Sequence, residues 1–534
     1  MTSNKPTVAY FCMEYGLSSQ FKIYSGGLGI LAGDMLKGAH DTKSPVIGIG
    51  LLWKQGYTEQ KIGADNRPYD SYPDYNYDFL EDTGVKVKVK IRTNEVVCKV
   101  WKTTKFGNAE LYLLDTYLPE NGDKLITGQL YGWFGEERVA QEMVLGIGGI
   151  RALRALKITP ALYHFNEGHA LFAGFELVAE KVKKGMEYKA AVEATKKEIV
   201  FTTHTPVLAG NEQHSLELLE YMGAFHGQTA AQMTELGGKP FNMTVAALRL
   251  SKKSNAVAKL HAVTANDMWK DIKGRSEIMA ITNGVHNGTW VDERFATDMS
   301  DENVWKSHMQ LKNELIDLVH QRSQVKLNPD TLLIGFSRRA ATYKRSNLIF
   351  SDLERARKLF SANKLQIVFS GKAHPQDAGG KEIIRQIVQM SKEFPKHVVF
   401  LENYDMIIGA ALTRGADVWL NNPRRPLEAC GTSGMKAAMN GVLNVSTLDG
   451  WWDEGCQDGV NGWAIGDEKI YKTEEEHDKV DALSLYETFE EKVIPTFYDN
   501  RKKWIEMMQA SIKSCREEFS AARMVEDYYK YLYI

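Results

Sequence analysis

Five short apolar runs in the second half of the chain place the strongest limit on its fold. Helical segments, such as the one around Lys381–Ser391, separate the runs from one another. Apolar strands that alternate with helices are typical of a parallel sheet with helices on both faces. The sequence therefore predicts a doubly wound α/β domain. Its predicted strands are Leu332–Phe336, Leu365–Ser370, His397–Leu401, Val418–Leu420 and Val442–Ser446.

The first half of the chain also combines buried strands with helices. Valines alternate with lysines between Gly84 and Trp101, which is typical of a half-exposed antiparallel strand with its lysines on a solvated face. A long helical pattern covers Glu136–Lys157, and another covers Lys502–Tyr533. Buried strands are predicted at Thr7–Phe11, Pro45–Leu51, Ala161–Phe165 and Glu198–Thr202.

The length of 534 residues is too great for one hydrophobic core, so we expect two large domains. The turn-rich segment Thr282–Gly288 lies near the middle of the chain, and we place the boundary there. The predicted domains are residues 1–284 and 285–534. In one alternative the terminal helix returns to the N-terminal domain.

Composition excludes several classes of function. The chain has 66 basic and 68 acidic residues, so nothing favours nucleic acid or an anionic membrane as a partner. Its 5 cysteines contain no CxxC pair, which fits a reducing compartment better than a disulfide framework or structural zinc. We found no secretory signal and no apolar run long enough to span a bilayer. We therefore expect a cytoplasmic protein.

The segment Glu428–Gly441 carries the most distinctive chemistry. Glycines and hydroxyls precede a helix of small residues, so backbone N–H groups at the helix start can bind an anion. Lys436 is the only cation there, and a lysine near a helix N-terminus is disfavoured as an ammonium ion. Such a lysine suits amine chemistry, including a Schiff base with pyridoxal phosphate. The alternative is an ordinary loop that caps a buried helix.

Four cations follow the strand Leu332–Phe336 within eight residues: Arg338, Arg339, Lys344 and Arg345. Like charges this close repel one another unless an anion lies between them. A solvated basic loop is the alternative. The position favours the anion, because the carboxyl ends of strands in an open α/β sheet face the ligand crevice.

Two further segments end strands in the first half. Gly26 and Gly27 open a helix after a turn, an arrangement that offers backbone amides to phosphate, although a tight packing turn has the same pattern. His204 follows the strand Glu198–Thr202, where a side chain faces the crevice rather than the core. No histidine pair with helical spacing lies nearby, so we predict no metal site.

Taken together, these segments resemble the α-glucan phosphorylases of glycogen, starch and maltodextrin, and most closely their compact bacterial and archaeal branch. The resemblance rests on Gly26-Gly27-Leu28-Gly29, on residues 338–345, on residues 428–436, and on Trp451-Trp452-Asp453-Glu454-Gly455. It implies the GT-B glycosyltransferase architecture, in which two Rossmann-like doubly wound domains face a central cleft.

The resemblance assigns a role to each candidate residue. Lys436 would carry pyridoxal 5'-phosphate as a Schiff base, and Thr432, Ser433, Tyr404 and Arg338 would contact this cofactor. Arg338, Arg339, Lys344 and the Gly27 amide would bind the substrate phosphate, while His204, Asn283, Glu428, Gly431 and Gly26 would bind the sugar. The chain has Arg338 where the family usually has a lysine, and it departs from the larger enzymes at Ala341 and Asp405, where histidine and arginine are usual.

The implied reaction is the reversible phosphorolysis of an α-1,4-glucan to glucose 1-phosphate, with retention of anomeric configuration. The partners would be the glucan, inorganic phosphate and glucose 1-phosphate; a homodimer is compatible with the resemblance. Two rivals stay open. One is a nucleotide-sugar-dependent glucan synthase of the same architecture, which usually has a lysine at the position of Ser25. The other is a non-catalytic glucan-binding protein.

Overall fold

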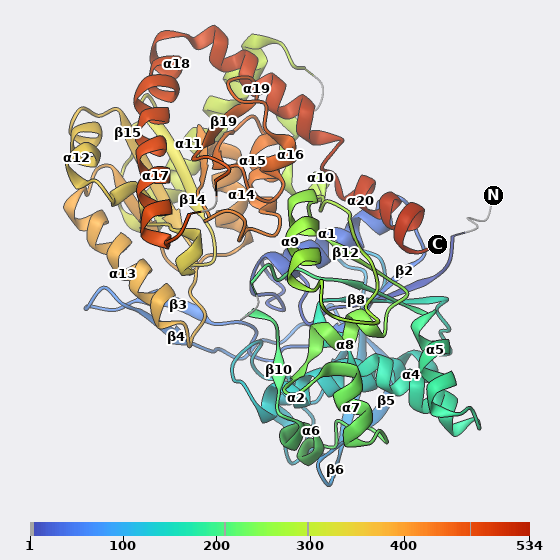
Figure 1. Cartoon of the computed structure of the whole chain (residues 1–534). Helices are drawn as coiled ribbons and strands as arrows, with labels where there is room; N and C mark the ends of the chain where they lie inside the picture. The colour runs from blue at the N-terminus through green and yellow to red at the C-terminus, as the bar shows by residue number, and fades with distance from the viewer. Residues whose placement is uncertain (1–4, 208–209, 296–297, 470) are drawn as a thin grey trace. The chain divides into compact units, whose positions relative to one another are not determined.

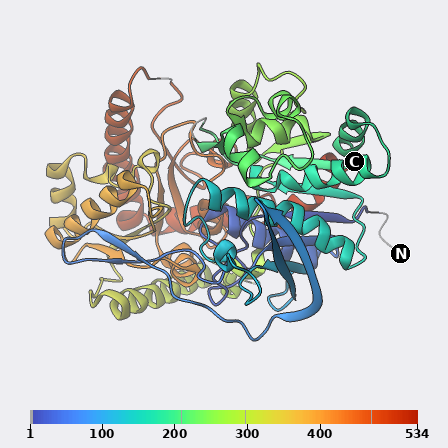
Figure 2. The ribbon, with the colours of Figure 1, turned by 90° about the horizontal axis from the view of Figure 1, so that it is seen from below.

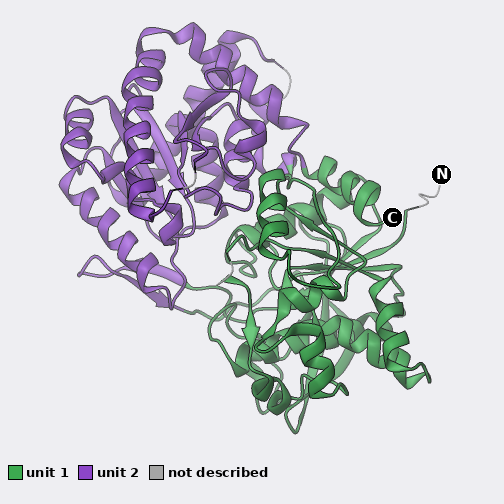
Figure 3. Ribbon diagram, in the orientation of Figure 1, with its two compact units in different colours: residues 1–58, 72–286, 521–534 green, residues 59–71, 287–520 purple. Residues whose placement is uncertain are grey.

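A computed structural model describes residues 5–207, 210–295, 298–469 and 471–534. The chain forms two compact units (Figure 3). Unit 1 contains residues 1–58, 72–286 and 521–534, and unit 2 contains residues 59–71 and 287–520. The expected domain limits, 1–284 and 285–534, stay a prediction.

A nine-stranded sheet forms the centre of unit 1, with the strand order β13-β12-β9-β8-β1-β2-β7-β6-β5. The strands from β13 to β7 are parallel, whereas β6 and β5 are antiparallel to their neighbours. The strands are β1 (Val8–Phe11), β2 (Val46–Leu51), β5 (Glu81–Ile91), β6 (Asn94–Thr103), β7 (Leu111–Asp115), β8 (Leu162–Asn166), β9 (Ile199–Thr202), β12 (Lys253–Ala256) and β13 (Ile278–Ala280).

Residues 84–101 form two strands rather than the single strand that was predicted. The β5–β6 hairpin turns at Arg92 and Thr93, and Arg92 has a φ of 55°, in the left-handed region used by tight turns. This hairpin forms one edge of the sheet (Figure 2). The lysines at 86, 88 and 90 are exposed, so their predicted solvated face is confirmed.

Helices and a short strand pair complete unit 1. The predicted helix Glu136–Lys157 is present, with a wider turn at Val144–Gly148 between α2 and α3. The helices are α1 (Gly27–Asp41), α2 (Glu136–Met143), α3 (Gly149–Ala155), α4 (Phe172–Lys183), α5 (Tyr188–Lys196), α6 (Leu216–Met222), α7 (Ala230–Gly237), α8 (Met243–Arg249), α9 (Lys259–Met268) and α20 (Ala521–Asp527). Strand β10 (Gln213–His214) pairs with β11 (Phe241–Asn242).

A six-stranded parallel sheet forms unit 2, with the order β16-β15-β14-β17-β18-β19. Counted along the chain, this is the order 3-2-1-4-5-6 of the doubly wound fold, so the ligand crevice is expected where β14 and β17 diverge. The strands are β14 (Leu332–Ser337), β15 (Leu365–Ser370), β16 (Val398–Leu401), β17 (Val418–Asn421), β18 (Leu443–Thr447) and β19 (Gly462–Ile465).

Both faces of this sheet are buried. Along β14, Leu332, Ile334 and Phe336 pack into one hydrophobic cluster and Leu333 packs into another. Helices therefore cover both faces (Figure 1), as the continuous apolar runs predicted. The helices are α10 (Asn287–Trp290), α11 (Asp301–Ser323), α12 (Leu353–Ser361), α13 (Ala378–Glu393), α14 (Met406–Gly415), α15 (Thr432–Ala438), α16 (Trp452–Gly455), α17 (Glu474–Glu487), α18 (Ile494–Asp499) and α19 (Arg501–Arg516). The hairpin of β3 (Glu59–Ile62) and β4 (Pro68–Ser71) also belongs to unit 2.

The C-terminal segment is not one continuous helix. It breaks between Arg516 and Ala521, and α19 and α20 belong to different units. The Ala521 amide donates to the Val285 carbonyl at 2.8 Å, and the Tyr533 hydroxyl hydrogen-bonds the ring of His164 at 2.9 Å. The last residues are thus part of the core of unit 1. No helix among the described residues has the length and apolarity needed to cross a membrane.

Candidate active site

A buried ion cluster joins the ends of β14 and β17 in unit 2. The Arg338 guanidinium lies 2.8 Å from one carboxylate oxygen of Glu428, and the Lys344 ammonium binds the other oxygen. All three side chains are at least nine-tenths buried. Burial alone would raise the pKa of Glu428, but the two cations outweigh it and lower the pKa to about 2. The structure therefore brings two cations of one loop together with a carboxylate that lies 84 residues after Lys344 in the chain.

The turn that carries Glu428 is held by Asp449. One Asp449 oxygen accepts the Glu428 amide at 2.9 Å, and the other accepts the Gly450 amide at 2.8 Å. Gly431 has a φ of 82°, in the left-handed region that favours glycine. Burial and the nearby Glu428 charge raise the pKa of Asp449. Sequence reasoning missed Asp449, although its position in Leu448-Asp449-Gly450 marked a turn.

Lys436 lies on α15, the helix that begins directly after this turn. It is 5 % exposed, and its ammonium lies 3.5 Å from the centre of the Trp290 ring. Among the described residues, the N-cap Gly431 of α15 provides no side-chain hydrogen bond to the free amides of the first helical turn. Trp290 was not predicted from the sequence; it follows the turn at Thr282–Gly288 that supplied the domain boundary.

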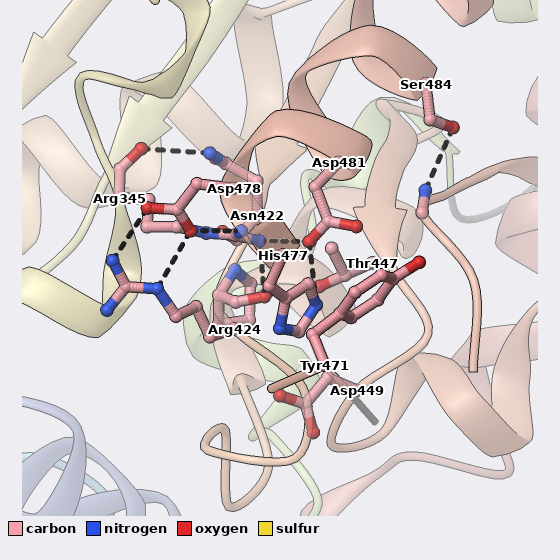
Figure 4. A network of polar contacts seen from close by, with 12 residues as sticks. Arg345, Asn422, Arg424, Thr447, Asp449, Tyr471, His477, Asp478, Asp481 and Ser484 are labelled. Carbon is pink, nitrogen blue, oxygen red and sulfur yellow. Dashed lines mark hydrogen bonds and ion pairs between the residues drawn. The ribbon is translucent and has the colours of Figure 1, made fainter. Parts of the chain in front are cut away.

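The four cations after β14 do not share one role. Arg339 is exposed. Arg345 is buried and binds the carbonyls of Asn422 and Pro423 and the carboxylates of Asp478 and Asp481 on α17 (Figure 4). Protein carboxylates therefore neutralise Arg345, the one cation of the four that the resemblance does not assign to phosphate. The spacing of the four cations could not predict that Arg345 pairs with α17, because α17 lies more than a hundred residues further along the chain.

Two cavities lie beside the ion pairs between Arg345 and α17, but Lys436 lines neither of them. Their volumes are about 610 and 580 Å³, and Arg424 and Asp478 line both of them. Neither Lys436 nor Glu428 is among the described residues that line them.

In unit 1, the Gly26-Gly27 turn is fixed by a buried carboxylate, that of Glu14. Glu14 accepts the amides of Ser25 at 2.5 Å and of Gly26 at 3.2 Å. The Gly26 amide is therefore engaged in this structure, and its predicted role as a sugar contact would need that bond to change. An added methyl group at Gly29 would lie 2.5 Å from Glu14, so the third glycine makes room for this carboxylate.

His204, also in unit 1, is a neutral histidine held by polar partners. Its Nε2 lies 2.6 Å from the Asn166 side-chain oxygen, which can only accept, so Nε2 carries the proton. Burial lowers the pKa of His204 to about 3. Glu167 accepts the His204 amide at 2.9 Å and the Gly168 amide at 3.2 Å, so its side chain caps the short helix that begins at Gly168. Glu167 has a φ of 78°, a strained value for a non-glycine residue.

Asn283 of unit 1 has an unused hydrogen-bond acceptor. The residue is 3 % exposed, and its side-chain oxygen is buried without a partner among the described residues. Its backbone is fully engaged: the amide donates to Val257 and the carbonyl accepts from Arg523. A buried acceptor without a donor is costly, so a ligand hydroxyl would stabilise this arrangement.

Tyr404 lies at the start of α14 in unit 2. Burial raises its pKa to about 12, so the phenol stays protonated. Gly409 packs beside it, since an added methyl group there would lie 2.5 Å from the Tyr404 hydroxyl. The loop that follows β15 is held close to β14, because a methyl group at Gly371 would lie 2.0 Å from the Arg338 carbonyl.

One group of residues has the geometry of a metal site, although none was predicted. Ligand atoms of Glu142, His169 and Glu212 lie within 4.8 Å of one another. Each carboxylate already has a cationic partner, however: His214 binds Glu142 at 3.0 Å and Arg138 binds Glu212 at 2.9 Å. We therefore assign no ion to this group.

Comparison with known proteins supplies independent evidence. Residues 292–456 match the sequence model of a family described as carbohydrate phosphorylase. The chain is 40 % identical to a maltodextrin phosphorylase of Thermococcus litoralis, over 98 % of this chain and 70 % of that protein. It is 37 % identical to a glycogen phosphorylase of Aquifex aeolicus, over 100 % and 86 % of the two chains. It is also 36 % identical to an uncharacterized protein of Methanocaldococcus jannaschii, over 99 % and 100 %.

Proposed function

The chain belongs to the carbohydrate phosphorylase family and is an α-glucan phosphorylase, and we propose that it releases α-D-glucose 1-phosphate from the non-reducing ends of α-1,4-glucans with retention of configuration. The glycosidic bond at C1 breaks, a bond from C1 to a phosphate oxygen forms, and the proton of the phosphate passes to the departing glucan hydroxyl. The reverse reaction extends the glucan. The GT-B arrangement of two Rossmann-like domains is part of this proposal.

The buried cluster around Glu428 is the observation that carries the proposal. Arg338 and Lys344 form a cationic pair at the switch point of the unit 2 sheet, and Lys436 lies on the helix that follows Glu428. Charge-assisted hydrogen bonds from such cations contribute about 1.5–3 kcal/mol each. These residues suit a site in which phosphate groups are held tightly and kept apart from water.

The same residues fit pyridoxal phosphate, which this family generally uses. Lys436 is a buried amine suited to a covalent bond with the aldehyde, and one terminal nitrogen of Arg338 is buried without a partner among the described residues. We propose Lys436 as the anchor, with Thr432, Ser433, Tyr404 and Arg338 as cofactor contacts. When bound, the cofactor supplies a phosphate group that exchanges a proton with inorganic phosphate.

The remaining residues are proposed to bind the substrates. Arg338, Arg339, Lys344 and the Gly27 amide would hold inorganic phosphate and stabilise the charge that develops as the glycosidic bond breaks. The unpartnered oxygen of Asn283 would accept a glucose hydroxyl. Further sugar contacts are assigned to His204, Glu428, Gly431 and Gly26.

Glucose 1-phosphate formation tests the proposal. Purified protein loaded with pyridoxal phosphate should release glucose 1-phosphate from maltodextrin only when inorganic phosphate is added. A parallel reaction with ADP-glucose and maltodextrin tests the synthase alternative. Chain extension from ADP-glucose, together with no product from phosphate, would reject the phosphorylase assignment. Gel filtration coupled to light scattering tests whether the protein is a homodimer.

A further inference from the structure

The Glu428 carboxylate forms ion pairs with Arg338 and Lys344, two cations that the proposed function assigns to phosphate binding. One of its oxygens lies 2.8 Å from the Arg338 guanidinium, and the other binds the Lys344 ammonium. The carboxylate thus uses both oxygens on the two cations. No other carboxylate among the described residues forms an ion pair with either cation.

Binding of a phosphate group to the same two cations is unfavourable while the Glu428 carboxylate remains there. Two anions a few ångströms apart repel strongly in a site that excludes water. Together the cluster has one negative and two positive side chains, so it neutralises a phosphate dianion only if the carboxylate moves away. Asp449 accepts the Glu428 amide at 2.9 Å and anchors this backbone, so the displacement is expected to involve the Glu428 side chain.

We propose that Glu428 is an internal counter-ion that a phosphate group must displace from Arg338 and Lys344, and that the displaced carboxylate then binds a sugar hydroxyl. The proposal rests on the function proposed above and deepens it. It makes Glu428 a positioning residue for the phosphate cations as well as a sugar contact. Sugar recognition then follows phosphate binding, because the carboxylate is released only when phosphate has taken its place.

The alternative is that Glu428 is a purely structural partner of two buried cations. The substitution Glu428→Gln separates the two cases because it keeps the side-chain size and removes the charge. If Glu428 competes with phosphate, the variant binds phosphate more tightly than the natural protein does. If Glu428 only supports the cations, its loss leaves phosphate binding unchanged or weaker. Exposed Glu402, in the same unit, provides the matched control Glu402→Gln with the same change in charge.

Two titrations distinguish the sources of the phosphate group. In the first, cofactor-free protein is titrated with pyridoxal phosphate and, separately, with pyridoxal, and absorbance is followed. In the second, the cofactor-loaded protein is titrated with inorganic phosphate by calorimetry. We expect Glu428→Gln to lower the dissociation constant at least tenfold in one or both titrations, with pyridoxal binding unchanged.

The pattern of tightening identifies the displacing group. Tightening in the first titration alone assigns the displacement to the cofactor's phosphate, and tightening in the second alone assigns it to the substrate. Unchanged or weaker binding in both titrations, or equal tightening in Glu402→Gln, overturns the proposal. Tightening in a protein that forms no glucose 1-phosphate would reject the proposed function and leave only the displacement of Glu428 by phosphate standing.

Stability provides a second measurement if Glu428→Gln folds poorly. Without its carboxylate, the variant leaves two buried cations unneutralised, so phosphate should raise its melting temperature more than that of the natural protein. The variant Glu428→Asp has a side chain one methylene shorter, so its carboxylate should pair less well with the two cations and the variant should bind phosphate with intermediate affinity. A phosphate-induced shift no larger than in the natural protein, in both variants, would contradict the displacement.

Discussion

Arg345 offers a quantitative test of how the loop that follows β14, residues 338–345, is held in unit 2. Its side chain is 3 % exposed and donates to Asn422 at 2.8 Å, to Pro423 at 2.9 Å and to Asp481 at 2.6 Å. Replacing Arg345 by glutamine leaves the Asp481 carboxylate, which is 1 % exposed, without this partner. Breaking one side of a buried ion pair costs about 3–5 kcal/mol. We therefore expect Arg345→Gln to lower the free energy of unfolding by about that amount.

Arg424→Gln is the matched control. Arg424 is 12 % exposed, and its partners Asp478 (Figure 4) and Glu474 are 30 % and 73 % exposed, so its ion pairs are more open to solvent than the Arg345–Asp481 pair. An ion pair that is open to solvent contributes only about 0–1 kcal/mol. The difference in burial, rather than the number of ion pairs, should therefore separate the two variants.

Equilibrium urea unfolding, followed by tryptophan fluorescence and circular dichroism, measures these changes and shows whether the two units unfold separately. A double-mutant cycle with Asp481→Asn should give a coupling energy of about 1–3 kcal/mol between Arg345 and Asp481. The reasoning is refuted if Arg345→Gln costs no more than Arg424→Gln, or if the two changes in the cycle add independently. Because Arg338 and Lys344 lie on the same loop, Arg345→Gln should also weaken cofactor binding.

Three further predictions concern the site and its pH dependence. Lys436→Ala should abolish the near-ultraviolet absorbance of bound cofactor, whereas Lys381→Ala should retain it; an unchanged spectrum in Lys436→Ala would reject the anchor. Asn283→Ala should lower kcat/KM for maltodextrin by about 10–100-fold with little change in melting temperature, because a lost hydrogen bond to a buried group costs about 1–3 kcal/mol. Equal kcat/KM values for the variant and the natural protein would contradict the sugar contact. Burial lowers the pKa of His164, His169 and His204 from 6.5 to about 3, so the unfolded chain takes up protons first and stability is lost as the pH falls below 6.5. At pH 5 each of these histidines should lower the free energy of unfolding by about 2 kcal/mol relative to pH 7. The variant His164→Gln should therefore show a smaller fall in melting temperature between pH 7 and pH 5 than the natural protein. An identical fall would show that His164 does not contribute.

Local patterns predicted much of the secondary structure. Largely apolar runs identified β14, β15, β16, β17 and β18 to within a residue or two, because a strand buried on both faces has few polar positions to interrupt it. The same reasoning failed at residues 84–101, where alternation continued through the turn at Arg92 and concealed a hairpin. It also failed after Arg516, where an amphipathic pattern continued across a break between two units.

Candidate site residues could be selected by type but not by partner. The sequence showed four cations after one strand, and resemblance assigned three of them to phosphate. It could not show that Arg345 turns to Asp481, nor that Glu14 holds the Gly26 turn, because both contacts join segments that are distant in the chain. Trp290 and Asp449 were missed for the same reason.

The sequence by itself determined the α/β class, the positions of most strands and the identity of the lysine, glycine and cationic segments, since each depends on residues that are neighbours along the chain. Only the tertiary structure decided which cations face Glu428, which of them is neutralised by α17, and that the C-terminal residues belong to the core of unit 1. Those outcomes depend on burial and on charge pairing between distant segments, and local sequence does not show which cation a carboxylate will pair with.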